Sequence, residues 1–144
     1  MIASPDLLVW LQERTALGSL SPTVLAAIAQ VIEEQILPAN SRLVEEDSVP
    51  TTLYILISGQ VESECSNPNK TVAAYGLLPG SVINLQELLL DRPAQCAIAT
   101  LTECHLWAIP AAKFQQLVGE YPEITQTFSR QLAEELVQLS SALN

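Results

Sequence analysis

LYILISGQV, residues 53–61, is the stretch that decides how this chain folds. Its first five residues are apolar and rich in β-branched and aromatic side chains, which favours a β-strand. Ser58 and Gly59 follow, and glycine readily takes the positive φ of a turn or a bulge. Residues 60–64 then continue with polar side chains directed outward. The stretch predicts strand segments joined by a turn or a bulge at Gly59.

Short strands are also expected on both sides of this stretch. Turn-forming residues recur between them at regular intervals, a pattern typical of a barrel or a jelly roll. We expect about eight antiparallel strands and a mainly β fold, an antiparallel double-stranded β-helix (jelly roll) with N-terminal helices and a C-terminal helical tail. The further strands are predicted at 36–37, 43–44, 71–78 after a hairpin loop at 66–70, 82–83, 95–101 and 104–109.

Helices are predicted before the roll. A Ser-Pro-Asp sequence opens a first helix over residues 5–15. Ser21 and Pro22 open a second helix, because serine is a good N-cap and proline fits the first helical position. We expect Trp10 to tie the first helix to the roll, where Trp107 packs.

Helices are also predicted after the roll. Pro110 can start a helix that ends near Gly119, and a last helix is expected from 121 to about 143. Four leucines of the last helix follow a 4-3-4 spacing, an a/d seam that either packs on the chain's own roll or forms a homodimer. These leucines are Leu132, Leu136, Leu139 and Leu143. The expected organisation is one domain over 1–144, with a helical segment 1–34, a β-roll 35–110 and C-terminal helices 111–143.

The charge balance limits the possible partners. The chain has 16 Asp and Glu against 6 Lys and Arg, a net charge of −10. Nucleic-acid binding needs a positive footprint, and an anionic membrane surface attracts basic segments, so neither is an expected partner. The N-terminus lacks a basic region, and no apolar run reaches about 18 residues, so neither a signal peptide nor a membrane helix is predicted. We expect a cytoplasmic protein.

The cysteines and the single histidine predict no metal site and no catalytic site. Cys65, Cys96 and Cys104 form no CxxC pair. They are either small, partly buried thiols in a reducing cytosol or include a disulfide between Cys96 and Cys104. His105 has no Ser–His–Asp or Cys–His spacing, and one histidine cannot supply the metal set of a cupin-like enzyme. We therefore expect no enzyme activity.

Several segments carry a family resemblance. Residues 53–61 are close to the pattern LYxIxxGxV, and residues 37–40 read LPAN, close to the pattern LPAG. Residues 75–80 read YGLLPG, which is similar to a segment that precedes a ligand-binding stretch. In this order they resemble the cyclic nucleotide-binding domain family, the sensor fold of the catabolite activator protein and of regulatory subunits of cyclic-nucleotide-dependent kinases. The likeness covers roughly residues 17–140. It implies a non-catalytic regulatory domain whose ligand, by the family alone, is cyclic AMP or cyclic GMP.

The resemblance also locates a ligand cassette after Gly80. In the family, a GxxFGE strand and a short helix hold the cyclic phosphate, the Glu binds the ribose hydroxyl and a later Arg pairs with the phosphate. Laid on this pattern without a gap, Asn84 replaces the second glycine, Leu85 replaces the Glu and Ala94 replaces the Arg. The cassette is thus degenerate, although the Gln95 amide could donate to a phosphate. The candidate ligand-binding positions are Asn84, Leu85, Gln86, Ala94 and Gln95.

Two hypotheses for the function remain. The first is a regulatory or sensor domain whose cyclic nucleotide binding is weakened or lost, so that it binds another ligand or none. The second is a structural module that dimerises through its last helix and acts on a protein partner without any ligand. Calorimetry with cyclic AMP and cyclic GMP separates them, because binding of either nucleotide is compatible with the first hypothesis and not with the second.

Overall fold

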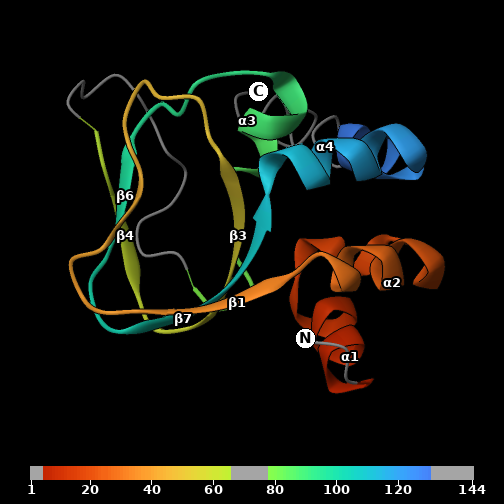
Figure 1. Cartoon of the computed structure of the whole chain (residues 1–144), viewed down its shortest axis with the longest axis horizontal. Coiled ribbons are helices and arrows are strands. Elements are labelled where there is room, and N and C mark those ends of the chain that lie inside the picture. Colours follow the sequence, from red (N-terminus) through yellow and green to blue (C-terminus); the bar gives the residue numbers. More distant parts are fainter. Residues whose placement is uncertain (1–4, 66–77, 131–144) are drawn as a thin grey trace, which may run out of the picture.

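Two antiparallel sheets form the roll, and the helices gather on one side of it (Figure 1). The computed structural model describes residues 5–65 and 78–130. The sheet nearer the helices contains, in spatial order, β1 (Glu33–Leu37), β7 (Cys104–Pro110), β3 (Thr52–Ser58) and β5 (Val82–Ile83). The second sheet contains β2 (Arg42–Val44), β6 (Ala97–Thr100) and β4 (Val61–Glu64). The prediction of a mainly β, antiparallel fold with flanking helices is confirmed. The predicted hairpin loop 66–70 and nearly all of the strand 71–78 lie outside the described residues.

Strand β3 separates two apolar clusters, because successive side chains of a strand point to opposite faces. Leu53 and Ile55 are fully buried toward the helices, whereas Leu56 is fully buried toward the interior of the roll. We call the first cluster the helix-side core. Its buried members are Leu11, Leu17, Leu20, Val24, Leu25, Ile28, Ala29, Ile32, Leu53, Ile55, Leu88, Trp107, Ile109, Phe114, Leu117, Ile124 and Phe128. The second, the roll-interior cluster, consists of Val44, Leu56, Val61, Ile83, Ala94, Ile98, Cys104 and Leu106.

The turn after β3 requires the glycine predicted there. Gly59 has a φ of +98°, a conformation that side chains with a Cβ rarely adopt. A Cβ on Gly59 would lie 2.5 Å from the backbone oxygen of Glu103 and 2.7 Å from the Cys104 sulfur. The turn therefore packs directly on the start of β7.

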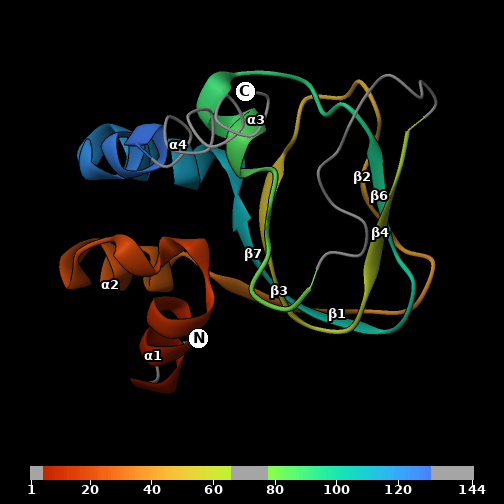
Figure 2. The same ribbon diagram turned by 180° about the vertical axis from the view of Figure 1, so that it is seen from behind.

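The helices lie together beside the roll (Figures 1 and 2). They are α1 (Pro5–Arg14), the short 3-10 segment η1 (Ala16–Ser19), α2 (Pro22–Gln30), α3 (Leu85–Leu90), α4 (Ala111–Glu120) and a helix that begins at 123. The rings of Trp10 and Trp107 meet edge to face, with centroids 5.1 Å apart, which confirms the predicted tie between the first helix and the roll. None of the helices in the described residues is long and apolar enough to cross a membrane.

A carboxylate from the C-terminal part of the chain closes the start of α2. Ser21 is the N-cap, as predicted, but its side chain makes no capping bond to its own helix. Instead, Glu123 Oε1 accepts the backbone N–H of Ser21 at 2.5 Å, and Glu123 Oε2 accepts its hydroxyl at 3.0 Å. A negative charge at a helix N-terminus is favourable because the N–H groups there have no partner within the helix. Glu123 therefore ties the N-terminal helices to the C-terminal ones.

Two details of the sequence predictions differ from the structure. Strand β1 begins at Glu33, two residues before the predicted start of the roll, because Glu33 and Glu34 pair with β7 and this pairing overrides their helix propensity. The cysteine predictions are wrong for two of the three residues: a disulfide joins Cys65 and Cys96, whereas Cys104 is a free, buried thiol. Cys104 cannot be the partner, because it starts β7 in the other sheet and its Sγ donates to the Gln60 carbonyl at 3.3 Å.

Candidate functional site

The cassette, which we define as residues 80–96, runs from the turn at Gly80 along β3 to α3 and then across one end of the roll to β6 (Figures 1 and 2). Gly80 has a φ of +98°, and its N–H donates to the carbonyl of Leu56 at 2.8 Å. A Cβ on Gly80 would lie 2.1 Å from the backbone oxygen of Arg14, the last residue of α1. The first glycine of the pattern is thus the point at which the cassette contacts the N-terminal helix.

Asn84, which stands where the family pattern has its second glycine, takes a left-handed conformation. Its φ is 76° and its ψ is 12°, a region that asparagine tolerates better than most residues. The side chain is buried, with 7% of its surface exposed, and its Nδ2 donates to the carbonyl of Thr52 at 2.8 Å. The asparagine therefore combines a left-handed backbone with a buried amide that is hydrogen-bonded to β3.

The Thr52 carbonyl needs this donor because of where it lies in the sheet. Ala111 donates to Thr51, so Thr51 faces β7 and the backbone groups of Thr52 face the opposite neighbour, β5. Strand β5 ends at Ile83, two residues before Leu85, which the same register would place opposite Thr52. The Asn84 amide takes the place of that missing partner.

Leu85 belongs to the helix-side core. Helix α3 directs Leu85, Leu88 and Leu89 toward this core, and Leu88 is almost fully buried. Gln86 is exposed. The side chain that stands at the ribose-binding position is therefore part of the packing of α3 on the helices.

Ala94 belongs to the roll-interior cluster, and 3% of its surface is exposed. Its N–H donates to the Ser48 carbonyl at 2.8 Å, and its carbonyl accepts the Asp47 N–H at 2.7 Å. These two bonds fasten the cassette to the loop between β2 and β3. The phosphate-binding position thus holds a methyl group that packs on apolar side chains, while the neighbouring Gln95 is exposed.

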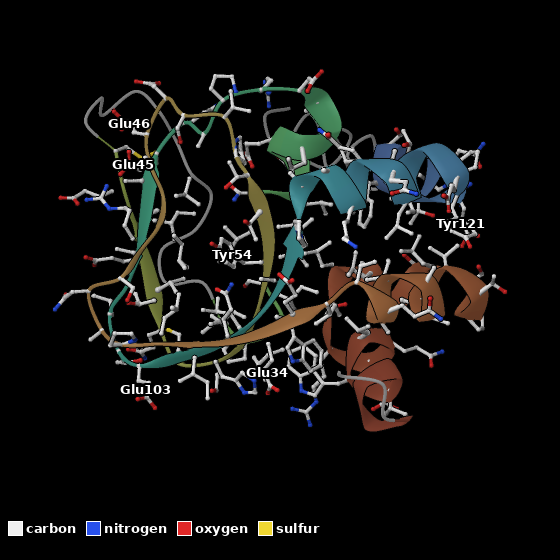
Figure 3. The ribbon with its side chains drawn as sticks, in the orientation of Figure 1. Glu34, Glu45, Glu46, Tyr54, Glu103 and Tyr121 are labelled. Atoms are coloured by element: carbon white, nitrogen blue, oxygen red, sulfur yellow. A yellow bond between two sulfur atoms is a disulfide. The ribbon has the colours of Figure 1, made fainter. Side chains whose placement is uncertain are left out.

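The loop that pairs with Ala94 is acidic. Glu45 and Glu46 lie at the end of the roll where the cassette crosses from α3 to β6 (Figure 3). Arg92, the only basic residue of the cassette, is exposed. The charge beside the phosphate-binding position is therefore predominantly negative, which disfavours an anionic ligand.

Sequence reasoning missed Tyr54. Its side chain is half-buried, packs against the roll-interior cluster and lies between the two sheets (Figure 3). The signal was available, since Tyr54 and Leu56 are two residues apart in a strand and so share a face. Tyr54 places a phenol ring in the otherwise apolar interior next to the cassette.

The five predicted positions do not form one polar cluster. The amide of Asn84 is used by Thr52, Leu85 and Ala94 belong to different apolar clusters, and Gln86 and Gln95 are exposed. The described residues contain no group of three or more His, Cys, Asp or Glu side chains that could hold a metal ion. The predicted dimer leucines, Leu132, Leu136, Leu139 and Leu143, lie outside the described residues.

Comparison with known proteins assigns this arrangement to a family. A family model described as "Cyclic nucleotide-binding domain" matches residues 34–121. The cAMP-dependent protein kinase regulatory subunit of Aspergillus fumigatus is 27% identical over 115 residues, which cover 80% of this chain and 27% of that protein. The chain therefore spans about a quarter of the length of this relative.

Solved structures share the fold. The catabolite activator protein of Thermus thermophilus superposes with a TM-score of 0.68 and 17% identity, covering 87% of this chain and 59% of that one. The regulatory domain of Toxoplasma gondii PKA, crystallised with cAMP, superposes with a TM-score of 0.72 and 13% identity, covering 90% of this chain and 49% of that one. At these identities the likeness shows a common fold, a jelly roll with flanking helices.

Proposed function

Because this chain belongs to the cyclic nucleotide-binding domain family, we propose that it is a non-catalytic regulatory domain with weakened or lost binding of cyclic AMP and cyclic GMP. The relative from Aspergillus fumigatus is a kinase regulatory subunit, which supports a regulatory role for the domain. The expected loss of affinity comes from the residues at the phosphate-binding and ribose-binding positions of the cassette, Ala94 and Leu85.

The observation that carries this proposal is the environment of Ala94. The position at which the family pattern has its phosphate-binding Arg holds a buried methyl group among apolar side chains. A charge-assisted bond to a phosphate contributes about 1.5–3 kcal/mol. With the ribose-binding carboxylate also replaced, at Leu85, the combined loss is about 4 kcal/mol, or roughly three orders of magnitude in affinity. A cyclic nucleotide that a family member binds with a Kd of about 1 μM would bind to this chain with a Kd of about 1 mM.

A thermal-shift titration tests the proposal. With about 1 mM nucleotide, a Kd of about 1 μM would stabilise the folded chain by about 4 kcal/mol and raise the Tm by about 12 °C. A Kd of about 1 mM stabilises it by only about 0.4 kcal/mol, which shifts the Tm by roughly 1 °C. We expect the small shift for both nucleotides, and a shift near 10 °C would contradict the proposal.

A pair of variants shows whether the two side chains are responsible. The double substitution Leu85→Glu with Ala94→Arg restores the charged groups of the family pattern, and we expect it to increase the nucleotide-dependent Tm shift. Arg92→Ala is the matched control, because Arg92 is exposed and we expect its removal to change nothing. If the double variant folds but gains no shift, the apolar packing of the roll interior, rather than the two side chains, excludes the nucleotide.

We also propose that the domain is cytoplasmic and dimerises through the leucine seam predicted for the last helix. The cytoplasmic location is supported by the family and by the acidic composition of the sequence. Sedimentation velocity tests the dimer. A dimer that is lost on Leu136→Lys but kept on the exposed-site control Glu120→Lys supports the seam, whereas a monomer at high concentration contradicts it.

A further inference from the structure

Two cysteines lie opposite each other at the point where the cassette joins the second sheet. The ladder between β4 and β6 pairs Ser63 with Ile98 and Glu64 with Ala97. One more step of this register places Cys65 opposite Cys96, and the structure joins them in a disulfide with a Cα–Cα distance of 4.5 Å. This distance is typical of directly opposed residues at a non-hydrogen-bonded position of an antiparallel pair. The sheet register itself therefore brings the two sulfurs together.

The disulfide closes a covalent loop around the cassette. The two cysteines are 31 positions apart, and β5, α3 and all five predicted site positions lie between them. Cys96 directly follows Gln95, and Ala94 is fastened to the loop between β2 and β3 by two backbone hydrogen bonds. The bridge thus fixes the end of the cassette at which these bonds are made.

The two cysteines differ in exposure. Cys65 is partly exposed and follows β4, which lies at an edge of the second sheet within the described residues, whereas Cys96 has 2% of its surface exposed. Thiol–disulfide exchange needs attack on a reachable sulfur. Because Cys65 is the more exposed residue, we expect attack at its sulfur, with Cys96 as the leaving group.

We propose that Cys65 and Cys96 are a reversible thiol–disulfide pair that exchanges with low-molecular-weight thiols and controls how firmly the cassette is held. The thiolate of a small thiol attacks Cys65 Sγ, forms a mixed disulfide there and releases Cys96 as a thiolate, which takes a proton from water. A second small thiol attacks the mixed disulfide, so two small thiols are oxidised to one small disulfide and the protein pair is reduced. The reverse sequence, with a small disulfide as oxidant, restores the bridge.

A cytoplasmic location fits a reversible pair. Disulfides in the cytosol are rare, and those present are usually transient or redox-sensing. This step rests on the location proposed above, but the exchange chemistry and its test in vitro do not. The buried Cys104 takes no part, because it lies in the roll-interior cluster and contacts backbone carbonyls.

The first measurement counts thiols in the full chain after equilibration with glutathione buffers. After oxidation we expect one free thiol of the three, Cys104, and a peptide in which Cys65 is linked to Cys96. After exposure of the native chain to about 5 mM reduced glutathione we expect three free thiols. Three thiols under both conditions, or a bridge that resists the reductant for hours in the native chain, would overturn the proposal.

The second measurement follows the effect of the bridge on the cassette. For a loop of this length, we expect the reduced chain to melt about 10 °C below the oxidised one. We also expect the Ala94 amide to exchange its hydrogen at least about tenfold faster after reduction. The variant Cys65→Ala with Cys96→Ala should behave like the reduced chain in either buffer, and Cys104→Ala should keep the redox-dependent shift. A Tm that does not respond to reduction, or an equal response in the double variant, would contradict the control of the cassette by this pair.

Discussion

The buried amide of Asn84 allows a prediction in which backbone conformation and hydrogen bonding can be separated. Replacing Asn84 by alanine removes the donor of the 2.8 Å bond to the Thr52 carbonyl and leaves a residue with a Cβ at a φ of 76°. Losing the hydrogen bond costs about 1 kcal/mol. Holding alanine in the left-handed backbone conformation lowers the free energy of unfolding by about 1 kcal/mol more. We expect Asn84→Ala to lower the free energy of unfolding by about 2 kcal/mol, measured by urea denaturation at equilibrium.

Two further substitutions at the same position divide this loss. Asn84→Gly also removes the donor but adopts the backbone conformation freely, so we expect a loss of only about 1 kcal/mol. Asn84→Asp keeps the shape and the tolerance for positive φ but turns an acceptor toward the Thr52 carbonyl, so we expect a loss of about 2 kcal/mol. An aspartate variant as stable as the natural chain would refute the role of the hydrogen bond. A glycine variant less stable than the alanine variant would refute the role of the backbone conformation.

Two other predictions concern the contacts that hold the helices. Glu123→Ala removes both acceptors that close the start of α2 at Ser21, and we expect a loss of about 2 kcal/mol in urea unfolding. Glu120→Ala, a change at an exposed position of α4, should have almost no effect, and equal losses for the two variants would contradict the role of Glu123 at the start of α2. Gly80→Ala introduces a Cβ 2.1 Å from the backbone oxygen of Arg14 at a φ of +98°, and we expect a loss of about 3 kcal/mol in the same assay. An alanine variant within about 0.5 kcal/mol of the natural chain would show that α1 does not pack on this turn.

The fold was predictable from the sequence where local chemistry determines it. The apolar run at 53–57 forms β3, Gly59 forms the turn, and Ser21 with Pro22 opens α2, because each depends on preferences of a few neighbouring residues. The start of β1 at Glu33 was missed, since two glutamates favour a helix locally and only the pairing with β7 makes them a strand.

The contacts of the site were less predictable because they depend on long-range register. The pairing of Cys65 with Cys96 follows from the alignment of β4 with β6, and no local pattern in the sequence fixes that alignment. Likewise, the Asn84 amide finds the Thr52 carbonyl only because β5 ends one residue earlier. The burial of Ala94, by contrast, is consistent with its small apolar side chain.

The central claim is that the domain keeps the family fold and has weakened or lost nucleotide binding, and isothermal titration calorimetry with cyclic AMP and cyclic GMP tests it most directly. The titration should be run on the oxidised and on the reduced chain, so that the state of the Cys65–Cys96 pair is known. The account predicts a Kd of about 1 mM or weaker for both nucleotides in both states. A Kd tighter than about 10 μM for either nucleotide would contradict it, because we attribute affinity of that size to the Arg and Glu of the family pattern, which Ala94 and Leu85 replace.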